Sequence, residues 1–121
     1  MTQGVAMLTV AKGANLALMF FLELGVLIAV GYWGFTLGAP LGLRILVGLG
    51  APAVFATLWG LFAAANGARF PLHGLARAAF EIAWFGGGAV ALVASGVATG
   101  GAVFAVLYAV NAVLRLVWDQ V

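Results

Sequence analysis

Hydrophobic residues dominate four long stretches of the chain, and short segments rich in glycine, proline or charge separate them. The stretches cover residues 14–35, 43–65, 78–98 and 102–118. A helix needs about 20 apolar residues to cross a bilayer, because each residue advances it by about 1.5 Å and the hydrocarbon layer is about 30 Å thick. The pattern predicts an all-α integral membrane protein in which residues 1–121 form one transmembrane four-helix bundle.

The separating segments predict where the helices end. The proline in the GAP sequence at 38–40 stops the first helix, because its ring removes a backbone donor. Residues 66–77 form the only polar loop of any size, and residues 95–101 form a short uncharged hairpin. Four crossings place both ends of the chain on the same side of the membrane.

Composition supports this class and excludes others. Hydrophobic residues make up 66% of the chain, charged residues only 7%, and the mean hydropathy is +1.23. Soluble domains carry roughly 25% charged residues, so this chain lacks the polar surface of a water-exposed globule. Five basic residues are too few for a nucleic-acid-binding stripe. The chain has no cysteine and one histidine, so we expect neither a metal site nor another cofactor.

The basic residues are distributed unevenly between the two sides. Arg44 lies alone on one side, and the side of the chain ends carries Lys12, Arg69, Arg77 and Arg115. Because cytoplasmic segments carry the excess of Lys and Arg in membrane proteins, both termini and the polar loop are predicted to be cytoplasmic. The N-terminus lacks the early basic cluster of a signal peptide, so the first crossing is expected to remain in the mature protein.

Glu23 lies near the middle of the first hydrophobic stretch. A carboxylate in hydrocarbon is costly unless it is neutral, paired or hydrated, so its side chain is expected to face other polar groups. Helical spacing places Tyr108, Asn111 and Arg115 on one face of the last helix. We predict that Glu23 pairs with Asn111 or Tyr108, which lie at similar depth, and Arg115 is long enough to reach inward to it.

Glu81 is the acidic residue of the third stretch, and it lies closer to the cytoplasmic interface. At about 1.5 Å per residue, Glu81 and Arg115 both fall within about 6 Å of that interface. Arg77 precedes Glu81 by one helical turn and lies on the same face. We therefore predict that Glu81 pairs with Arg115 or Arg77.

Two interpretations of these polar residues stay open. In the first they form a structural clasp, in which hydrogen bonds between helices contribute about 0.6 kcal/mol each. In the second, Glu23 is a protonatable group that exchanges a proton or holds a cation. Catalysis lacks parts, because Ser95 and His73 lie on opposite sides of the membrane and Glu23 and Glu81 lie at different depths. The chain is therefore expected not to be an enzyme.

Several short motifs follow one another in a fixed order along the chain. They are FLEL at 21–24, GYWG at 31–34, Pro52 with WGLF at 59–62, RAAFE at 77–81, LYxxN at 107–111, and Trp118. This set resembles the YrdB family of small four-span bacterial membrane proteins, which is regarded as a domain of unknown function. The resemblance implies the same four-helix membrane fold and lends no activity. It also groups the candidate residues Glu23, Trp59, Arg77, Glu81, Tyr108 and Asn111 as one unit, to which the pairing argument adds Arg115.

These observations predict a small multi-pass protein of the bacterial cytoplasmic (inner) membrane. Its expected role is that of a non-enzymatic accessory or structural subunit with a buried polar cluster of Glu, Arg, Asn and Tyr residues. The alternative is a small proton- or cation-coupled transporter or channel centred on Glu23. Expected partners are the lipid bilayer and either further copies of the chain or the subunits of a larger membrane complex.

Overall fold

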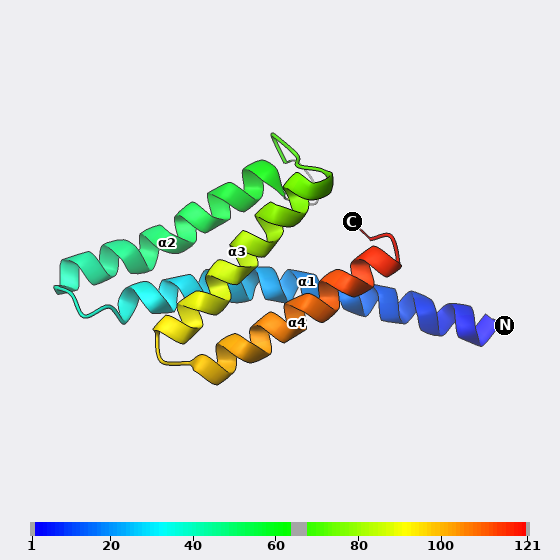
Figure 1. Cartoon of the computed structure of the whole chain (residues 1–121), viewed down its shortest axis with the longest axis horizontal. Coiled ribbons are helices and arrows are strands. Elements are labelled where there is room, and N and C mark those ends of the chain that lie inside the picture. Colours follow the sequence, from blue (N-terminus) through cyan, green and yellow to red (C-terminus); the bar gives the residue numbers. More distant parts are fainter. Residues whose placement is uncertain (1, 64–67, 121) are drawn as a thin grey trace.

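The structure, a computed structural model, describes residues 2–63 and 68–120, and each regular element in them is a helix. The four helices are α1 (Thr2–Phe35), α2 (Leu41–Phe62), α3 (Gly74–Ala94) and α4 (Ala98–Val117). Figure 1 shows α1 running along the length of the molecule, with α2 on one side of it and both α3 and α4 crossing it. Each helix is long and apolar enough to cross a membrane, which indicates a multi-pass membrane protein.

α1 is the longest helix and begins well before the predicted crossing. It contains 34 residues and starts at Thr2, whereas the hydropathy pattern placed the crossing from residue 14. At about 1.5 Å per residue it measures about 51 Å, roughly 20 Å more than the hydrocarbon layer. The segment before residue 14 contains no proline, so the helix continues past the apolar crossing. Figure 1 shows this N-terminal part extending beyond the other helices.

α2 ends at Phe62, and the last residues of the predicted crossing, together with Asn66, lie outside the described residues. The helix continues through Pro52. The polar loop was predicted to run to residue 77, but α3 already begins at Gly74. Arg77 therefore belongs to the first turn of a helix, from which its side chain contacts Glu81 of the same helix and Ala63 after α2.

The turn between α3 and α4 is shorter than the predicted hairpin at 95–101. Gly96 adopts a φ of +85°, and the N–H of Val97 donates to the carbonyl of Leu92 at 2.8 Å. This geometry is a glycine-dependent helix end, in which the left-handed residue lets the chain turn back and satisfies the last carbonyls. α3 and the start of α4 therefore lie four residues earlier than the predicted crossings.

The helices pack most closely where glycines remove side chains from the contact. α1 packs against each of the other three helices. Its Gly34 meets α2 so closely that an added Cβ would lie 2.5 Å from the backbone nitrogen of Gly48, and a Cβ on Gly31 would lie 3.3 Å from the Gly48 carbonyl oxygen. Small residues allow such backbone approach between membrane helices. Figure 1 shows α1 and α2 close together at their connecting loop and diverging away from it.

In α3, two of the three consecutive glycines at 86–88 also allow close packing against neighbouring helices. A Cβ on Gly87 would lie 3.0 Å from the ring of Phe55 on α2, and one on Gly88 would lie 2.9 Å from Val26 on α1. α3 is thereby held against both helices of the first hairpin.

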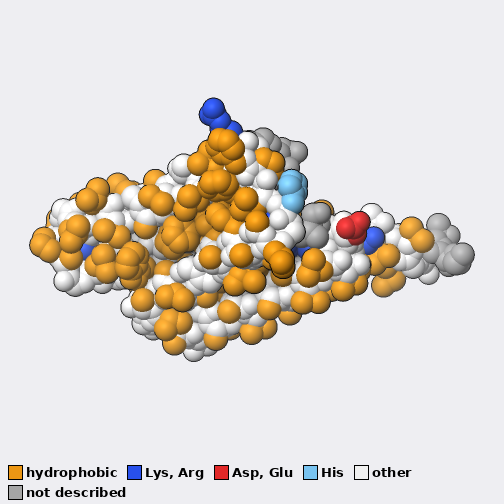
Figure 2. Space-filling view, turned by 45° about the horizontal axis from the view of Figure 1, so that its top comes forward, with side chains coloured by type: hydrophobic (Ala, Val, Ile, Leu, Met, Phe, Trp, Pro, Cys, Tyr) orange, Lys and Arg blue, Asp and Glu red, His pale blue; other side chains and the backbone are white. Residues whose placement is uncertain are grey.

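The buried core lies where α1, α2 and α3 meet. The outer surface of the helices is largely apolar. Val26 and Phe85 are fully buried, and Trp59 and Trp84 are nearly so. Figure 2 shows hydrophobic side chains over most of one face, with few charged groups among them. Large exposed apolar surfaces on a soluble monomer mark an interaction site, and here they occur along all four helices, as expected of lipid-facing helices.

Candidate functional site

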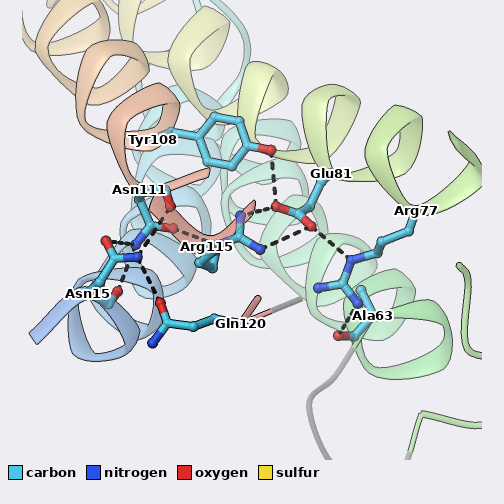
Figure 3. Close-up of polar contacts among 8 residues, drawn as sticks. All are labelled: Asn15, Ala63, Arg77, Glu81, Tyr108, Asn111, Arg115 and Gln120. Atoms are coloured by element: carbon cyan, nitrogen blue, oxygen red, sulfur yellow. Dashed lines mark hydrogen bonds and ion pairs between the residues drawn. The ribbon is translucent and has the colours of Figure 1, made fainter. Parts of the chain in front are cut away.

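Two arginines converge on one carboxylate between α3 and α4. Arg115 of α4 donates to both carboxylate oxygens of Glu81 on α3, through Nη2 to Oε1 and through Nη1 to Oε2 at 3.4 Å. Arg77, one turn before Glu81, donates through Nε to Oε2 at 2.9 Å. The phenol of Tyr108 donates to Oε1 at 3.1 Å. Figure 3 shows these groups arranged around Glu81.

Glu81 and Arg115 are buried, so each hydrogen bond between them matters more for stability than it would at the surface. Glu81 is 4% exposed and Arg115 is 3% exposed. Burying charges is costly unless they are paired and their remaining hydrogen-bonding positions are filled. Here the carboxylate accepts four hydrogen bonds from three protein side chains. Loss of either partner would leave an uncompensated charge inside the bundle.

An amide pair joins α4 to α1. The Asn111 Nδ2 donates to the backbone carbonyl of Asn15 at 2.7 Å and to its side-chain Oδ1 at 2.9 Å. The Asn15 Nδ2 donates in return to the carbonyl of Asn111 at 3.3 Å. The Oδ1 of Asn111 accepts from the Nε of Arg115 at 2.8 Å, so the amide pair is continuous with the ion pair. Asn111 is fully buried, as a reciprocal arrangement of this kind requires.

The chain end after α4 closes the cluster on α1. Asp119 adopts a φ of +53°, and the N–H of Gln120 donates to the Arg115 carbonyl at 2.7 Å. This left-handed helix end turns the chain back toward α1. The Gln120 side chain then accepts from Asn15 Nδ2 at 3.2 Å and donates to the carbonyl of Lys12 at 3.0 Å.

α2 enters the cluster through Arg77. The Nη1 of Arg77 donates to the carbonyl of Ala63, the residue directly after α2, at 3.1 Å. Its guanidinium carbon lies 5.3 Å from the ring centroid of Trp59, a cation–π contact. We call the connected set the polar clasp, and it consists of Asn15, Arg77, Glu81, Tyr108, Asn111, Arg115 and Gln120. The polar clasp links all four helices (Figure 3).

Aromatic rings pack beneath the polar clasp. The rings of Trp59 and Trp84 are 4.4 Å apart between centroids, and Phe85 stacks on Tyr108 at 4.4 Å. The indole of Trp84 donates to the carbonyl of Phe55 at 2.9 Å, across to α2. Aromatic pairs at such spacing contribute about 0.5–1.5 kcal/mol beyond their buried area. They fix the side of α3 from which Glu81 projects.

Glu23 stands apart from the polar clasp. It is only partly buried, on the side of α1 that faces α2, and among the described residues no hydrogen bond of ordinary length and angle ends on its carboxylate. The indole of Trp59 approaches it, and the charges of Arg77 and Arg115 act on it from a distance. Glu23 lies 11 residues after Lys12 and 12 before Phe35, so it is midway along the part of α1 that lies beside the other helices.

The predicted pairs are partly correct. Glu81 binds both Arg115 and Arg77, as predicted. The predicted pairing of Glu23 with Asn111 or Tyr108 is wrong, because Tyr108 donates to Glu81 and Asn111 is engaged with α1. Sequence depth does not reveal which way a residue faces around its helix, and Glu23 faces α2 rather than α4.

Two members of the polar clasp were not predicted, Asn15 and Gln120. A signal for Asn15 is present in the sequence, because it lies at helical spacing from Met19, Leu22 and Val26, which are all buried. An amide on the core-facing stripe of a helix needs a partner. Gln120 reaches α1 only because the chain turns back after α4, and the sequence of that segment does not specify this turn.

The site offers few groups for chemistry. In the part of the chain that the structure describes, no three His, Asp or Glu side chains gather at one place as metal ligands would. The Glu81 carboxylate accepts four hydrogen bonds, from Arg77, Tyr108 and Arg115. The arrangement joins the helices through Glu81 and Asn111, and it leaves the Glu23 carboxylate outside these bonds.

Comparison with known proteins yields one family match. A family described as protein of unknown function (DUF2568) matches residues 17–109. The matched range contains Glu23, Trp59, Arg77, Glu81 and Tyr108 and ends two residues before Asn111. The match gives an uncharacterised domain, and it does not bear on the YrdB name. No curated protein and no solved structure matches the chain significantly.

Proposed function

For a chain that belongs to the DUF2568 family of proteins of unknown function, we propose the role of a non-enzymatic accessory or structural subunit in a membrane. The observation that carries this proposal is the polar clasp, which joins four helices and fills the hydrogen-bonding positions of Glu81. A paired, dry charge cluster fixes the arrangement of helices more than it offers a reactive group. A rigid apolar bundle of this kind is suited to present its outer face to lipid and to other membrane segments.

The proposal includes a location and an orientation. We place the protein in the bacterial cytoplasmic membrane with both termini in the cytoplasm. The support is the distribution of basic residues, with Arg44 alone at one end of the bundle and Lys12, Arg69, Arg77 and Arg115 at the other. Further copies of the chain or the subunits of a larger complex are its proposed partners.

Purification in a mild detergent followed by mass measurement of the intact assembly tests this role. We expect a defined homo-oligomer or a stoichiometric complex with other membrane proteins. The clasp variant Arg115→Gln is expected to lose that assembly, whereas the exposed Thr57→Val, whose hydroxyl bonds only to its own helix, should keep it. A wild-type protein that is monomeric and free of partners in several detergents and in nanodiscs would contradict the proposal.

A second candidate function is supported by a different observation. The Glu23 carboxylate is partly exposed and lacks the hydrogen bonds that Glu81 has. Ionisable groups at mid-membrane mark proton and ion pathways, so Glu23 supports a small proton- or cation-coupled transporter or channel. Purified protein in liposomes should then show proton or cation flux that Glu23→Gln abolishes and the exposed Asp119→Asn retains. Equal flux in Glu23→Gln and wild type would reject this function.

A further inference from the structure

The charges between the helices are unequally shared. Two guanidinium groups, those of Arg77 and Arg115, bind the single carboxylate of Glu81. That group of three carries one surplus positive charge. A second carboxylate, Glu23, is within electrostatic range of both arginines and is bound to neither. Two carboxylates and two guanidinium groups would balance, so the surplus charge and the unpaired carboxylate complement each other.

Arg77 is the arginine that can leave Glu81 at low cost. Its side chain is 26% exposed, against 4% for that of Arg115. Arg77 donates to Glu81 only through Nε, at 2.9 Å, whereas Arg115 donates to both carboxylate oxygens and is fixed from behind by Asn111. Without Arg77, Glu81 would keep both bonds from Arg115 and the bond from Tyr108.

Trp59 lies between Arg77 and Glu23. The Arg77 guanidinium lies over the Trp59 ring at 5.3 Å, and the same indole approaches the Glu23 carboxylate. The Nη2 of Arg77 donates to no described residue. An aromatic face stabilises a cation that moves across it, because the attraction to the ring is not tied to one hydrogen-bonding direction. The tryptophan therefore provides a path for the guanidinium from one carboxylate toward the other.

We propose that Arg77 exchanges between Glu81 and Glu23, and that a proton and this guanidinium compete for the Glu23 carboxylate. This inference rests on the second candidate function and adds to it the group that controls proton binding. With Arg77 on Glu81, Glu23 binds a proton and is a neutral carboxylic acid. When Arg77 moves to Glu23, its hydrogen bond to the Glu81 Oε2 breaks and one to the Glu23 carboxylate forms. The Glu23 proton then leaves to water at the end of the bundle where α3 begins, and no covalent bond other than this O–H bond changes. Glu81 stays ionised in both states.

Other charged and titratable groups near this exchange are few. Around Glu23 they are Arg77 and Glu81 on α3 and Arg115 on α4, while α2 contributes the uncharged Trp59. Tyr108 is bonded to Glu81. On the element that carries Arg77, the imidazole of His73 lies one turn earlier, with its backbone carbonyl accepting from the Arg77 N–H. The test is therefore made in a protein in which His73 is replaced.

Nitrogen NMR of the arginine side chains in nanodiscs tests the exchange directly. The chain has four arginines, so four Nε signals are expected, and single substitutions assign them. A pH titration of the His73→Gln protein should move the Arg77 signal in step with the carboxylic-acid infrared band of Glu23. In His73→Gln with Glu23→Gln, the pH response of Arg77 should disappear. The Arg44 signal, at the other end of the bundle, should stay constant throughout and serves as the control.

Two outcomes would overturn the proposal. One is an Arg77 signal that does not respond to pH while the Glu23 carboxyl titrates. The other is a response that persists without Glu23. Should Glu23→Gln not fold, the comparison of Arg77 with Arg44 in the otherwise unchanged protein still decides. Because this readout does not depend on flux, exchange without flux would reject the transporter function alone, and flux without exchange would reject the role of Arg77 alone.

Discussion

Glu81 and Glu23 are two carboxylates on apolar helices, and their surroundings differ in almost every respect. Glu81 is 4% exposed and accepts four hydrogen bonds from three side chains on two helices. Glu23 is partly exposed at the edge between α1 and α2 and has an indole nearby. Both residues are glutamates in similar sequence contexts, FLEL and FEIA, so the residue itself does not determine the difference.

The contrast separates a structural charge from an available one. A buried charge with all its hydrogen-bonding positions filled resists change, because any loss leaves a desolvated partner behind. A carboxylate without such partners can gain or lose a proton, or accept a cation, at little cost to the fold. The same few residues therefore divide into a polar clasp that joins the helices and one carboxylate, Glu23, that lies outside it.

The largest expected effect comes from breaking the Glu81 side. Arg115→Gln removes both bonds to Glu81 and the bond to Asn111, and it leaves Glu81 with Arg77 and Tyr108. Breaking a buried ion pair by deleting one partner costs about 3–5 kcal/mol, so we expect a loss of that size in the free energy of unfolding. Reversible unfolding in lipid bicelles measures it. A loss below about 1 kcal/mol would mean that the pair of Arg115 and Glu81 is not buried in the bicelle-embedded protein.

The next effect tests the link from the ion pair to α1. Asn111→Leu leaves the Asn15 Oδ1 and the Arg115 Nε without their partner in a buried place, while the Asn15 Nδ2 keeps its bond to Gln120. Unsatisfied buried groups cost about 1–3 kcal/mol, so we expect a loss of about 2 kcal/mol. The control is Thr9→Val on the exposed part of α1, where the hydroxyl bonds only to the Val5 carbonyl and no change is expected. Equal effects of the two substitutions would contradict the account.

A third substitution disturbs the contact between α1 and α2, the two helices between which Glu23 lies, and leaves the contacts of Glu81 unchanged. In Gly34→Ala the added Cβ would lie 2.5 Å from the backbone of Gly48, so α1 and α2 must separate. We expect a loss of about 1 kcal/mol, since overpacking outweighs the better helix propensity of alanine. Gly60→Ala on α2 meets nothing within 4 Å and should be neutral or slightly stabilising. Thermal unfolding of both variants in one detergent makes the comparison, and a stabilised Gly34→Ala would show that the contact is looser.

The smallest effect is expected from removing the hydrogen bond that Tyr108 donates to Glu81. Tyr108→Phe removes one hydrogen bond to Glu81 and leaves the ring stacked on Phe85. Hydrogen bonds between membrane helices contribute about 0.6 kcal/mol on average, so a change of that size is expected in unfolding. The same substitution in the Arg115→Gln background should have a larger effect if the two donors share one carboxylate. Strict additivity would show that they act independently.

Hydropathy and charge predicted much of the fold. They did not predict where each helix begins or which of its faces meets a neighbouring helix. The four crossings and the pairs of Glu81 follow from apolar length and from counting residues to the helix ends. The extent of α1 did not follow, because an apolar segment fixes the crossing and not where the helix begins. Asn15 was missed for that reason, since it appeared to lie at a helix end rather than opposite Asn111.

The environment of Glu23 could not be predicted from its depth alone. Residues at equal depth meet only if their helices turn the right faces toward each other, and those faces are set by packing. Gly34 and Gly48 bring α1 against α2 and thereby place Glu23 beside Trp59 rather than beside α4. Such contacts depend on three-dimensional fit between small residues, which the order of residues along one chain does not specify.

The most direct test of the division between the two carboxylates compares Glu81→Gln with Glu23→Gln in the same bicelles. Both substitutions remove one negative charge and keep the size and hydrogen-bonding capacity of the side chain. We predict that Glu81→Gln lowers the free energy of unfolding by about 3 kcal/mol, since the buried Arg115 and the partly buried Arg77 lose their counter-charge, and that Glu23→Gln changes it by less than about 0.5 kcal/mol. Equal losses, or a larger loss for Glu23→Gln, would contradict the account.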